Sequence, residues 1–156
     1  MAHPDAGVER VYLDYNCFQR GFDDPRQVRI QMERLACQEI FFRAQAGGVE
    51  LVWSFMHEDE TVMCPFPERK QEALRLATLC TVRIGPTDEI RQIAESFQAR
   101  GGLSAKDAVH LACASSTGAR FFVTCDDVLL RQSSRLSLGP RPLNPVDYVR
   151  LEVHRE

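Results

Sequence analysis

Four acidic residues far apart in the chain stand where a predicted strand ends or where a helix follows one: Asp14, Glu60, Asp107 and Asp126. Asp14 comes directly after residues 11–13, whose β-branched and aromatic side chains are typical of a buried strand. Carboxylates that share a pocket repel each other and raise each other's pKa, and a bound cation relieves this repulsion. Hard divalent cations prefer oxygen ligands, so a pocket of carboxylates without histidine or cysteine indicates a Mg²⁺ or Mn²⁺ site.

Each acid also has a purely structural interpretation. Asp107 stands three residues after Ser104, which is the spacing of a helix capping box. Residues 126–127 can begin a helix, and residues 58–60 can form a solvated acidic face. Asp14 is the hardest to explain in this way, because a carboxylate at the end of a buried strand requires polar partners. The ordered set of four, more than any single acid, favours a functional site.

The elements that would position these acids alternate between strands and helices. Strands are predicted at residues 11–13, 50–53, 81–84, 120–124 and 142–143, and helices at 25–46, 55–60, 67–79, 88–101, 104–117, up to 130 and from 145. This alternation predicts one doubly wound α/β domain with a core of about residues 10–151, a parallel sheet of four or five strands and helices on both faces. Ligands of such sheets bind outside the carboxyl ends of the strands. If the first and fourth strands are neighbours, Asp14 and Asp126 face each other there.

Between the first strand and the first long helix, the sequence predicts a loop. The loop covers residues 20–25, and Asp24 followed by Pro25 is typical of a helix N-cap and the first helical position. Apolar side chains then recur at helical spacing: Val28, Met32, Leu35, Ala36 and Ile40. Ser54 is predicted to cap the helix that follows the second strand.

Composition indicates an ordinary single domain. The 156 residues are 44% hydrophobic, which is enough for one core, and the net charge of −3 provides no basic field for a DNA-binding module. This charge is compatible with a nuclease, in which acidic metal ligands offset basic phosphate contacts. Of the 19 basic residues all but Lys70 and Lys106 are arginines, the better bidentate partner of phosphate.

Cysteine spacing and the absence of targeting signals predict a cytoplasmic protein. No two of the six cysteines form Cys-x-x-Cys, so we expect reduced, mostly buried thiols rather than a structural zinc site or a disulfide framework. Residues 1–7 lack the basic and apolar regions of a signal peptide. No apolar run approaches the length of a membrane span.

Four short motifs occur in an order that resembles the PIN domain family. They are Leu-Asp-x-Asn at residues 13–16, Ser-x5-Glu at 54–60, Lys-Asp-Ala-x-His-Leu-Ala at 106–112 and Val-Thr-x-Asp-Asp at 123–127. The resemblance spans about residues 11–151, and residues 20–24 also resemble a loop of a bacterial subset of the family. PIN domains are metal-dependent ribonucleases, and many prokaryotic members are the toxins of toxin–antitoxin pairs. The resemblance therefore implies an endoribonuclease.

Carried over residue by residue, the resemblance implies a set of catalytic, metal-binding acids: Asp14, Glu60, Asp107 and Asp126. The family usually has an apolar stretch before the second acid, whereas residues 57–59 of this chain are His-Glu-Asp. Counting from Ser54 favours Glu60, and Glu58 stays open as the alternative.

Supporting roles are implied for neighbours of these acids. Asn16 and Thr124 would hydrogen-bond the carboxylates or a bound water, and Asp127 would assist Asp126. His110 is interpreted as a hydrogen-bonded helix residue rather than a metal ligand. Phosphate contacts are expected from basic residues near the motifs: Arg20, Lys106 or Arg131.

The implied reaction is hydrolysis of RNA phosphodiester bonds by a water that Mg²⁺ or Mn²⁺ activates and orients for in-line attack. A haloacid-dehalogenase-type phosphatase would need an aspartate at the position of Asn16. A zinc deaminase would need His-x-Glu with a later Cys-x-x-Cys, and no phosphate-binding P-loop motif occurs. The remaining alternative is a catalytically inactive PIN-like binding or scaffold protein. The expected partners are RNA, an antitoxin protein that covers the acidic pocket and a second copy in a homodimer, with no membrane.

Overall fold

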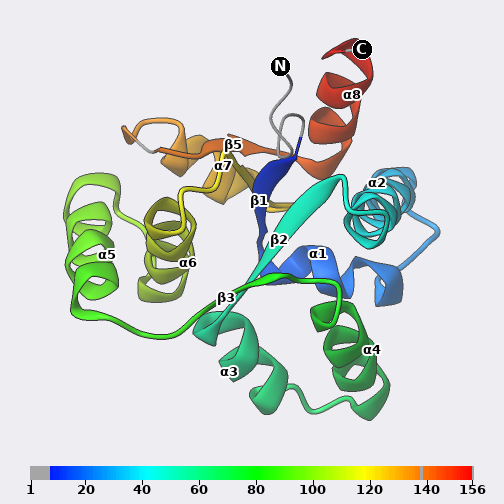
Figure 1. Cartoon of the computed structure of the whole chain (residues 1–156), viewed down its shortest axis with the longest axis horizontal. Coiled ribbons are helices and arrows are strands. Elements are labelled where there is room, and N and C mark those ends of the chain that lie inside the picture. Colours follow the sequence, from blue (N-terminus) through cyan, green and yellow to red (C-terminus); the bar gives the residue numbers. More distant parts are fainter. Residues whose placement is uncertain (1–7, 138, 156) are drawn as a thin grey trace.

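A sheet of five parallel strands forms the centre of the computed structural model, which describes residues 8–137 and 139–155 (Figure 1). The strands are β1 (Glu9–Leu13), β2 (Val49–Ser54), β3 (Val82–Ile84), β4 (Phe121–Val123) and β5 (Arg141–Leu143). Their order across the sheet is β3-β2-β1-β4-β5, and each neighbouring pair is parallel. The predicted fold class, an α/β domain built on a parallel sheet, is confirmed.

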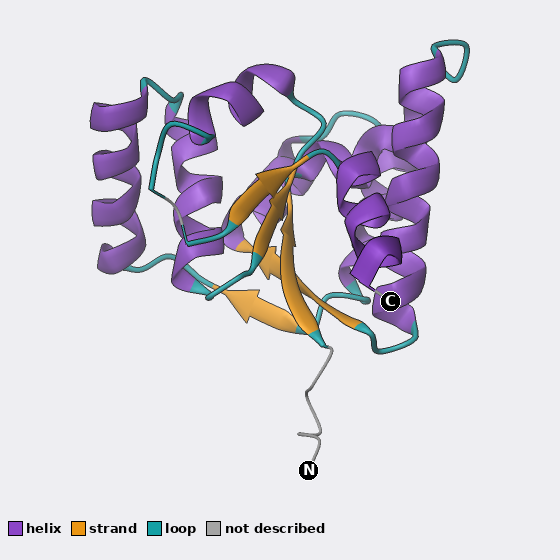
Figure 2. Cartoon of the chain, turned by 90° about the horizontal axis from the view of Figure 1, so that it is seen from above, coloured by secondary structure: helices purple, strands orange, loops and turns teal. Residues whose placement is uncertain are grey.

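Helices cover both faces of this sheet, as the view turned by 90° also shows (Figure 2). One layer contains α1 (Tyr15–Gln19), α2 (Val28–Gln45), α4 (Pro67–Ala77) and α8 (Pro145–Arg155). The other contains α5 (Asp88–Gly101), α6 (Ala105–Ser116) and α7 (Asp127–Ser133). Helix α3 (Phe55–Met63) directly follows the carboxyl end of β2. The predicted doubly wound arrangement is therefore present.

Strand β1 is the central strand, and its side chains are buried on both faces. Val11 and Leu13 belong to the hydrophobic core on one side of the sheet, and Tyr12 belongs to the core on the other side. This alternation follows from the period of two in a strand, and burial on both faces explains the continuous apolar run. Leu13 pairs with Val123 of β4, and the backbone N–H of Asp14 donates to the Val123 carbonyl at 2.8 Å. The carboxyl ends of β1 and β4 thus lie side by side, which is the condition under which Asp14 and Asp126 were expected to face each other.

The segment between β1 and α2 contains two short helices that the sequence does not predict. Residues 15–19, which precede the predicted loop, form α1, and the predicted loop at residues 20–25 begins with a turn of 3-10 helix at Arg20–Phe22. The sequence signal for α1 is short, since the helix has only five residues and its N-cap is Asp14 itself.

The predicted start of the long helix at Pro25 is wrong, because α2 begins at Val28. Asp24 and Pro25 instead form a turn, in which the N–H of Gln27 donates to the Asp24 carbonyl at 3.4 Å and the N–H of Arg26 donates to the Asp24 carboxylate at 3.0 Å. Pro at the second position of a turn is as favourable as at the start of a helix. Gln27 then has extended backbone angles, which separate this turn from α2.

In the described ranges, no helix combines the length and apolar character needed to cross a membrane. The expectation for residues 1–7 concerns a segment outside the described residues.

Candidate active site

Asp14 lies at the end of the central strand and is almost fully buried, with 6% of its surface exposed. Its Oδ1 accepts a hydrogen bond from the N–H of Tyr15 at 2.8 Å, and its Oδ2 accepts from Thr124 Oγ1 at 2.8 Å and Asn16 Nδ2 at 3.2 Å. Burial raises the pKa of Asp14, although His110 and the Thr124 hydrogen bond favour the ionised form. This carboxylate is thus oriented by three donors at some cost in desolvation.

Asn16 and Thr124 link the ends of β1 and β4 around Asp14. The Asn16 amide donates to Thr124 Oγ1 at 3.1 Å as well as to Asp14, and its carbonyl oxygen accepts from the N–H of Cys125 at 3.2 Å. Thr124 Oγ1 also accepts from the N–H of Asp126 at 3.1 Å. The two side chains therefore couple the position of the Asp14 carboxylate to the backbone that leads to Asp126.

Glu60, on α3, reaches the same edge of the sheet. Its Oε1 lies 2.5 Å from Nε2 of His110, and its Oε2 lies 3.2 Å from the Lys106 ammonium. Burial alone would raise the pKa of Glu60, but the hydrogen bonds and charges of His110 and Lys106 outweigh it, and the pKa is lowered. Nε2 of His110 also lies 4.0 Å from Oδ1 of Asp14. Asp14 and Glu60, 46 residues apart in sequence, thus meet across one imidazole nitrogen.

A chain of buried hydrogen bonds leads from Glu60 into the core. Nδ1 of His110 lies 2.6 Å from the hydroxyl of Tyr12, which lies 2.8 Å from the hydroxyl of Ser54. Tyr12, Ser54 and His110 are all buried. Each of these polar groups is satisfied by its neighbour, as buried polar groups require. His110 is therefore held in place from both sides of its ring, and Tyr12, predicted only as a strand residue, is part of this support.

His57 lies at the inner end of this chain, and its own hydrogen bonds fix its tautomer. The backbone N–H of Ser54 donates to Nδ1 of His57 at 2.9 Å, so the proton of that ring is on Nε2, which donates to the Leu13 carbonyl at 2.7 Å. Burial and the neighbouring His110 lower the pKa of His57 to about 3, which keeps the ring neutral. The Ser54 hydroxyl also lies 3.1 Å from Nδ1 of His57, so the chain of hydrogen bonds ends at this neutral imidazole.

Of the two glutamates that the sequence left open, Glu60 is the one beside Asp14. Glu58 is exposed, and its carboxylate accepts a hydrogen bond from the indole N–H of Trp53 at 2.9 Å. The predicted cap of α3 is present, since the Ser54 hydroxyl accepts from the N–H groups of Met56 and His57. This cap starts α3 in the register that turns Glu60, two residues after Glu58, towards α6.

Asp107 lies in the first turn of α6, on the same helix as the two partners of Glu60. Its backbone N–H donates to the hydroxyl of Ser104 at 3.1 Å, which is the predicted cap. Residues three apart on a helix lie on one face, so Asp107 shares a face with His110. Asp107 therefore stands one helical turn before the imidazole that binds Glu60.

Asp126 and Asp127 lie at the end of β4. Asp126 is exposed and caps α7, with its Oδ1 accepting from the N–H groups of Val128 at 2.9 Å and Leu129 at 3.1 Å. Asp127 forms an ion pair with Arg29 at 2.5 and 2.7 Å, and this hydrogen bonding lowers its pKa. The structural interpretation of these residues as a helix start is correct for Asp126.

No three of the four predicted acids, all of which lie in the described ranges, bring their ligand atoms within 4.8 Å of one another. In the part of the chain that the structure describes, one group of three His, Cys, Asp or Glu residues has ligand atoms within 4.8 Å of one another. That group consists of three cysteines: Cys17, Cys37 and Cys125. Asp14 and Glu60 approach each other through His110, and Asp126 is linked to Asp14 through Thr124.

The basic residues expected to contact phosphate differ in their ion-pair partners and in their exposure. Arg20 is bound to Asp23 and to Glu33, a fully buried carboxylate that the sequence analysis did not single out. Lys106 pairs with Glu60, whereas Arg131 is exposed near Asp127. Glu33 also pairs with Arg29, one turn earlier on α2, and accepts from Asn144 at 2.6 Å.

Comparison with known proteins agrees with this architecture. The chain matches the family model described as PIN domain over residues 11–134. It belongs to the PIN domain family, whose members are generally nucleases that use divalent metal ions.

The crystal structure of PAE2754 from Pyrobaculum aerophilum is a similar solved structure. The two chains are 15% identical, with a TM-score of 0.51 over 96% of this chain and 92% of that chain. At this level of identity the likeness concerns the fold alone. The comparison with curated proteins gives no match.

Proposed function

We propose that this protein is a metal-dependent ribonuclease that hydrolyses RNA phosphodiester bonds. The observation that carries the proposal is the meeting of Asp14 and Glu60 across Nε2 of His110, at 4.0 and 2.5 Å, outside the carboxyl ends of the parallel strands. Ligands of open α/β sheets bind at this edge. Membership of a family of nucleases supports the same conclusion.

The donor chemistry fits a hard divalent cation such as Mg²⁺ or Mn²⁺. The residues that would hold it are two carboxylates that follow strands and two that lie on helices: Asp14, Asp126, Glu60 and Asp107. Oxygen ligands of this kind suit Mg²⁺ and Mn²⁺ better than zinc or copper. When bound, such an ion would lower the pKa of the attacking water and stabilise negative charge on the phosphate.

The chain's own residues would orient these carboxylates. Asn16 and Thr124 fix both the position and the rotation of the Asp14 carboxylate through hydrogen bonds of 3.2 and 2.8 Å. His110, itself held by Tyr12, does the same for Glu60. Orientation of ligands by such neighbours typically contributes 10- to 100-fold, as an order of magnitude, to metal affinity or activity.

Cleavage of RNA in the presence and absence of divalent cations tests the proposal. Structured RNAs are incubated with the full chain in Mg²⁺ or Mn²⁺ and in EDTA. We expect cleavage only with metal and its loss in Asp107→Asn, because Asp107 carries little structural duty. Asp59→Asn is the matched control, since Asp59 is an exposed acid on α3 and should be dispensable.

Cleavage that survives both EDTA and Asp107→Asn would refute the mechanism. Stoichiometric Mn²⁺ binding without any cleavage would instead favour a catalytically inactive PIN-like binding protein. Mn²⁺ binding should disappear in Asp14→Asn in either case, because a nuclease and an inactive metal-binding protein would both hold the ion through the same carboxylates.

We further propose that the protein acts in the cytoplasm as the toxin of a toxin–antitoxin pair, and that it forms homodimers. Exposed apolar side chains on α2 support contact with another protein, with Val28 70%, Leu35 55% and Phe42 66% exposed. A small antitoxin is expected to cover the acidic edge and inhibit cleavage. We expect a short open reading frame next to the gene, and its product should copurify with the chain and stop RNA cleavage. A protein that is monomeric and toxic in no host would contradict the proposal.

A further inference from the structure

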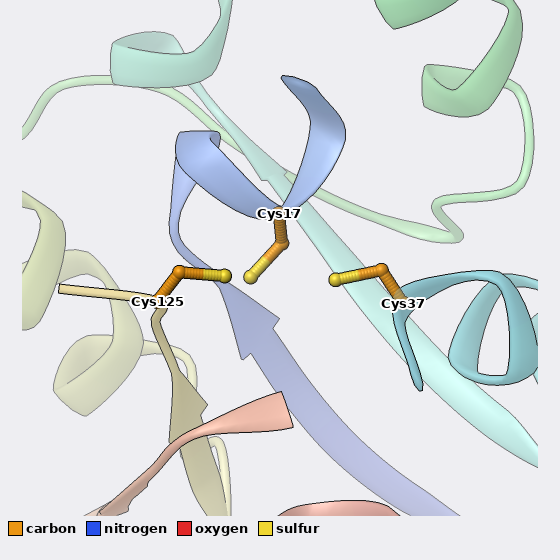
Figure 3. A group of neighbouring side chains, drawn as sticks. All are labelled: Cys17, Cys37 and Cys125. Atoms are coloured by element: carbon orange, nitrogen blue, oxygen red, sulfur yellow. The ribbon is translucent and has the colours of Figure 1, made fainter. Parts of the chain in front are cut away.

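Three cysteines from separate segments bring their sulfur atoms together (Figure 3). Cys17 comes from α1, Cys37 from α2, and Cys125 follows β4. Their Sγ atoms lie within 4.8 Å of one another, and all three residues are buried. Cys80 and Cys113 are equally buried but do not belong to the group, so burial of a thiol in this core does not by itself require other sulfurs nearby.

The spacing of the sulfurs suits coordination of one ion. With metal–sulfur bonds of about 2.3 Å, three ligands around a single ion lie about 4 Å apart. Small side-chain movements would therefore close the observed group around an ion. In the described residues no fourth His, Cys, Asp or Glu joins this group, whereas structural zinc sites almost always have four ligands. Cu⁺ is a soft ion that accepts three sulfur ligands, and thiolates select it.

We propose that Cys17, Cys37 and Cys125 form a binding site for one soft monovalent cation of the Cu⁺ class, held by three thiolates. Binding of one Cu⁺ forms three copper–sulfur bonds and releases the three thiol protons to solvent, with no change in oxidation state. The site shares no ligand with Asp14, Glu60, Asp107 or Asp126, so it does not depend on the proposed nuclease function.

A cavity and two arginines lie beside the cluster. The cavity, of about 280 Å³ between α2 and α4, is lined in part by Cys17 and Cys37. The Arg20 guanidinium is close enough to Cys125 to interact with its charge. Arg29 donates to the Cys125 carbonyl at 3.0 Å. Both arginines are also paired with carboxylates, Arg20 with Glu33 and Arg29 with Asp127, so they would offset only a small part of the negative charge of a thiolate–copper site.

Titration with Cu⁺ tests the site directly. The reduced full chain is titrated anaerobically with Cu⁺ in competition with a chromogenic Cu⁺ chelator. One ion per chain is expected in the unaltered protein and in Cys80→Ser, the matched buried control, with loss of this binding in Cys17→Ser, Cys37→Ser and Cys125→Ser. Cys64→Ser, which removes the only partly buried thiol among the six cysteines, should also leave one ion bound.

Several results would overturn the proposal. They are no Cu⁺ retained by the reduced unaltered protein, equal binding by Cys37→Ser, and Zn²⁺ held in competition as tightly as Cu⁺. Because a serine variant can fail to fold, X-ray absorption at the copper edge of the unaltered protein provides an independent measurement. Three sulfur neighbours at about 2.3 Å support the site, and fewer than three sulfurs contradict it.

Discussion

Two carboxylates at the sheet edge and two thiols of the cysteine cluster come from the same short segments but differ in ligand chemistry. Cys17 is three residues after Asp14, and Cys125 directly precedes Asp126. Asp14 is about as buried as these thiols, so burial does not separate the two groups. Because ligand softness selects the ion, the same turns of the chain can present a hard site and a soft site.

Asn16 stands between these two groups. Its amide nitrogen donates to Asp14 at 3.2 Å, while its carbonyl oxygen lies 3.5 Å from the sulfur of Cys17 and accepts from the N–H of Cys125. The side chain thus separates the oxygen ligands from the sulfur ligands and touches both. If the two groups of ligands are independent, substitution of an oxygen ligand should alter Mn²⁺ binding and RNA cleavage and leave Cu⁺ binding by the thiols unchanged.

The largest effect is expected from Asp14→Asn. Loss of a direct ligand should lower RNA cleavage by more than about 100-fold, above the range typical of residues that only orient a ligand. Cleavage rates at saturating Mn²⁺ provide the measurement, and retention of activity would remove Asp14 from the site.

Stability should respond to Asp14→Asn in the opposite direction. Burial raises the pKa of Asp14 above its ordinary value of 3.8. The folded chain is therefore favoured when this group is protonated, and that contribution is lost as pH rises through the raised pKa. The melting temperature of Asp14→Asn, relative to that of the unaltered chain, should therefore rise as pH increases from 3 to 7. A difference that stays constant over this range would contradict the raised pKa.

A smaller effect is expected from Thr124→Val, which removes one donor to Asp14 but no ligand. Mn²⁺ affinity and cleavage should each fall by about 10- to 100-fold. Thr124→Ser keeps the hydroxyl and should restore both. Equal loss in the serine and valine variants would show that packing of the methyl group, rather than the hydrogen bond of 2.8 Å, is what matters.

Glu60→Gln should change the pH dependence of stability. Its carboxylate is held by His110 and Lys106, which lower its pKa despite burial. The stabilising contribution is present above the ordinary pKa of 4.5 and is lost as pH falls through the lowered folded value. The variant should lose about 1.5–3 kcal/mol of unfolding free energy at neutral pH, and the difference from the parent should shrink in acid. Urea unfolding from pH 7 to pH 3 measures this, and a constant difference would contradict it.

Local signals explain what the sequence predicted well. Strand β1 was evident from Val11–Leu13, and the caps Ser54 and Ser104 start their helices as expected, because each depends on a few adjacent residues. The same locality explains the error at Pro25, since a turn and a helix start share its signature. Val28 and Leu35 have helical spacing but are exposed, because periodicity identifies a helix without showing which stripe meets the core.

Long-range contacts explain what the sequence did not predict. Nothing near His110 indicates that Tyr12, 98 residues away, holds one ring nitrogen while Glu60 binds the other. The cysteine cluster is a similar case, because Cys17, Cys37 and Cys125 have no spacing typical of a metal site. Both arrangements exist only after β1 pairs with β4 and the helices close over the sheet.

The smallest effect on RNA cleavage is expected from Cys37→Ala, and it tests whether the two groups of ligands are independent. Cys37 is the member of the cluster on α2, away from the segments that carry Asp14 and Asp126. Its replacement should cost about 1 kcal/mol of unfolding free energy, as for a typical substitution. Cu⁺ binding should be lost while Mn²⁺-dependent cleavage is unchanged. The reciprocal variant, Asp14→Asn, should lose cleavage and still bind one Cu⁺. If Cys37→Ala also abolished cleavage in a folded chain, the hard and soft ligands would have to be parts of one site, joined through Asn16.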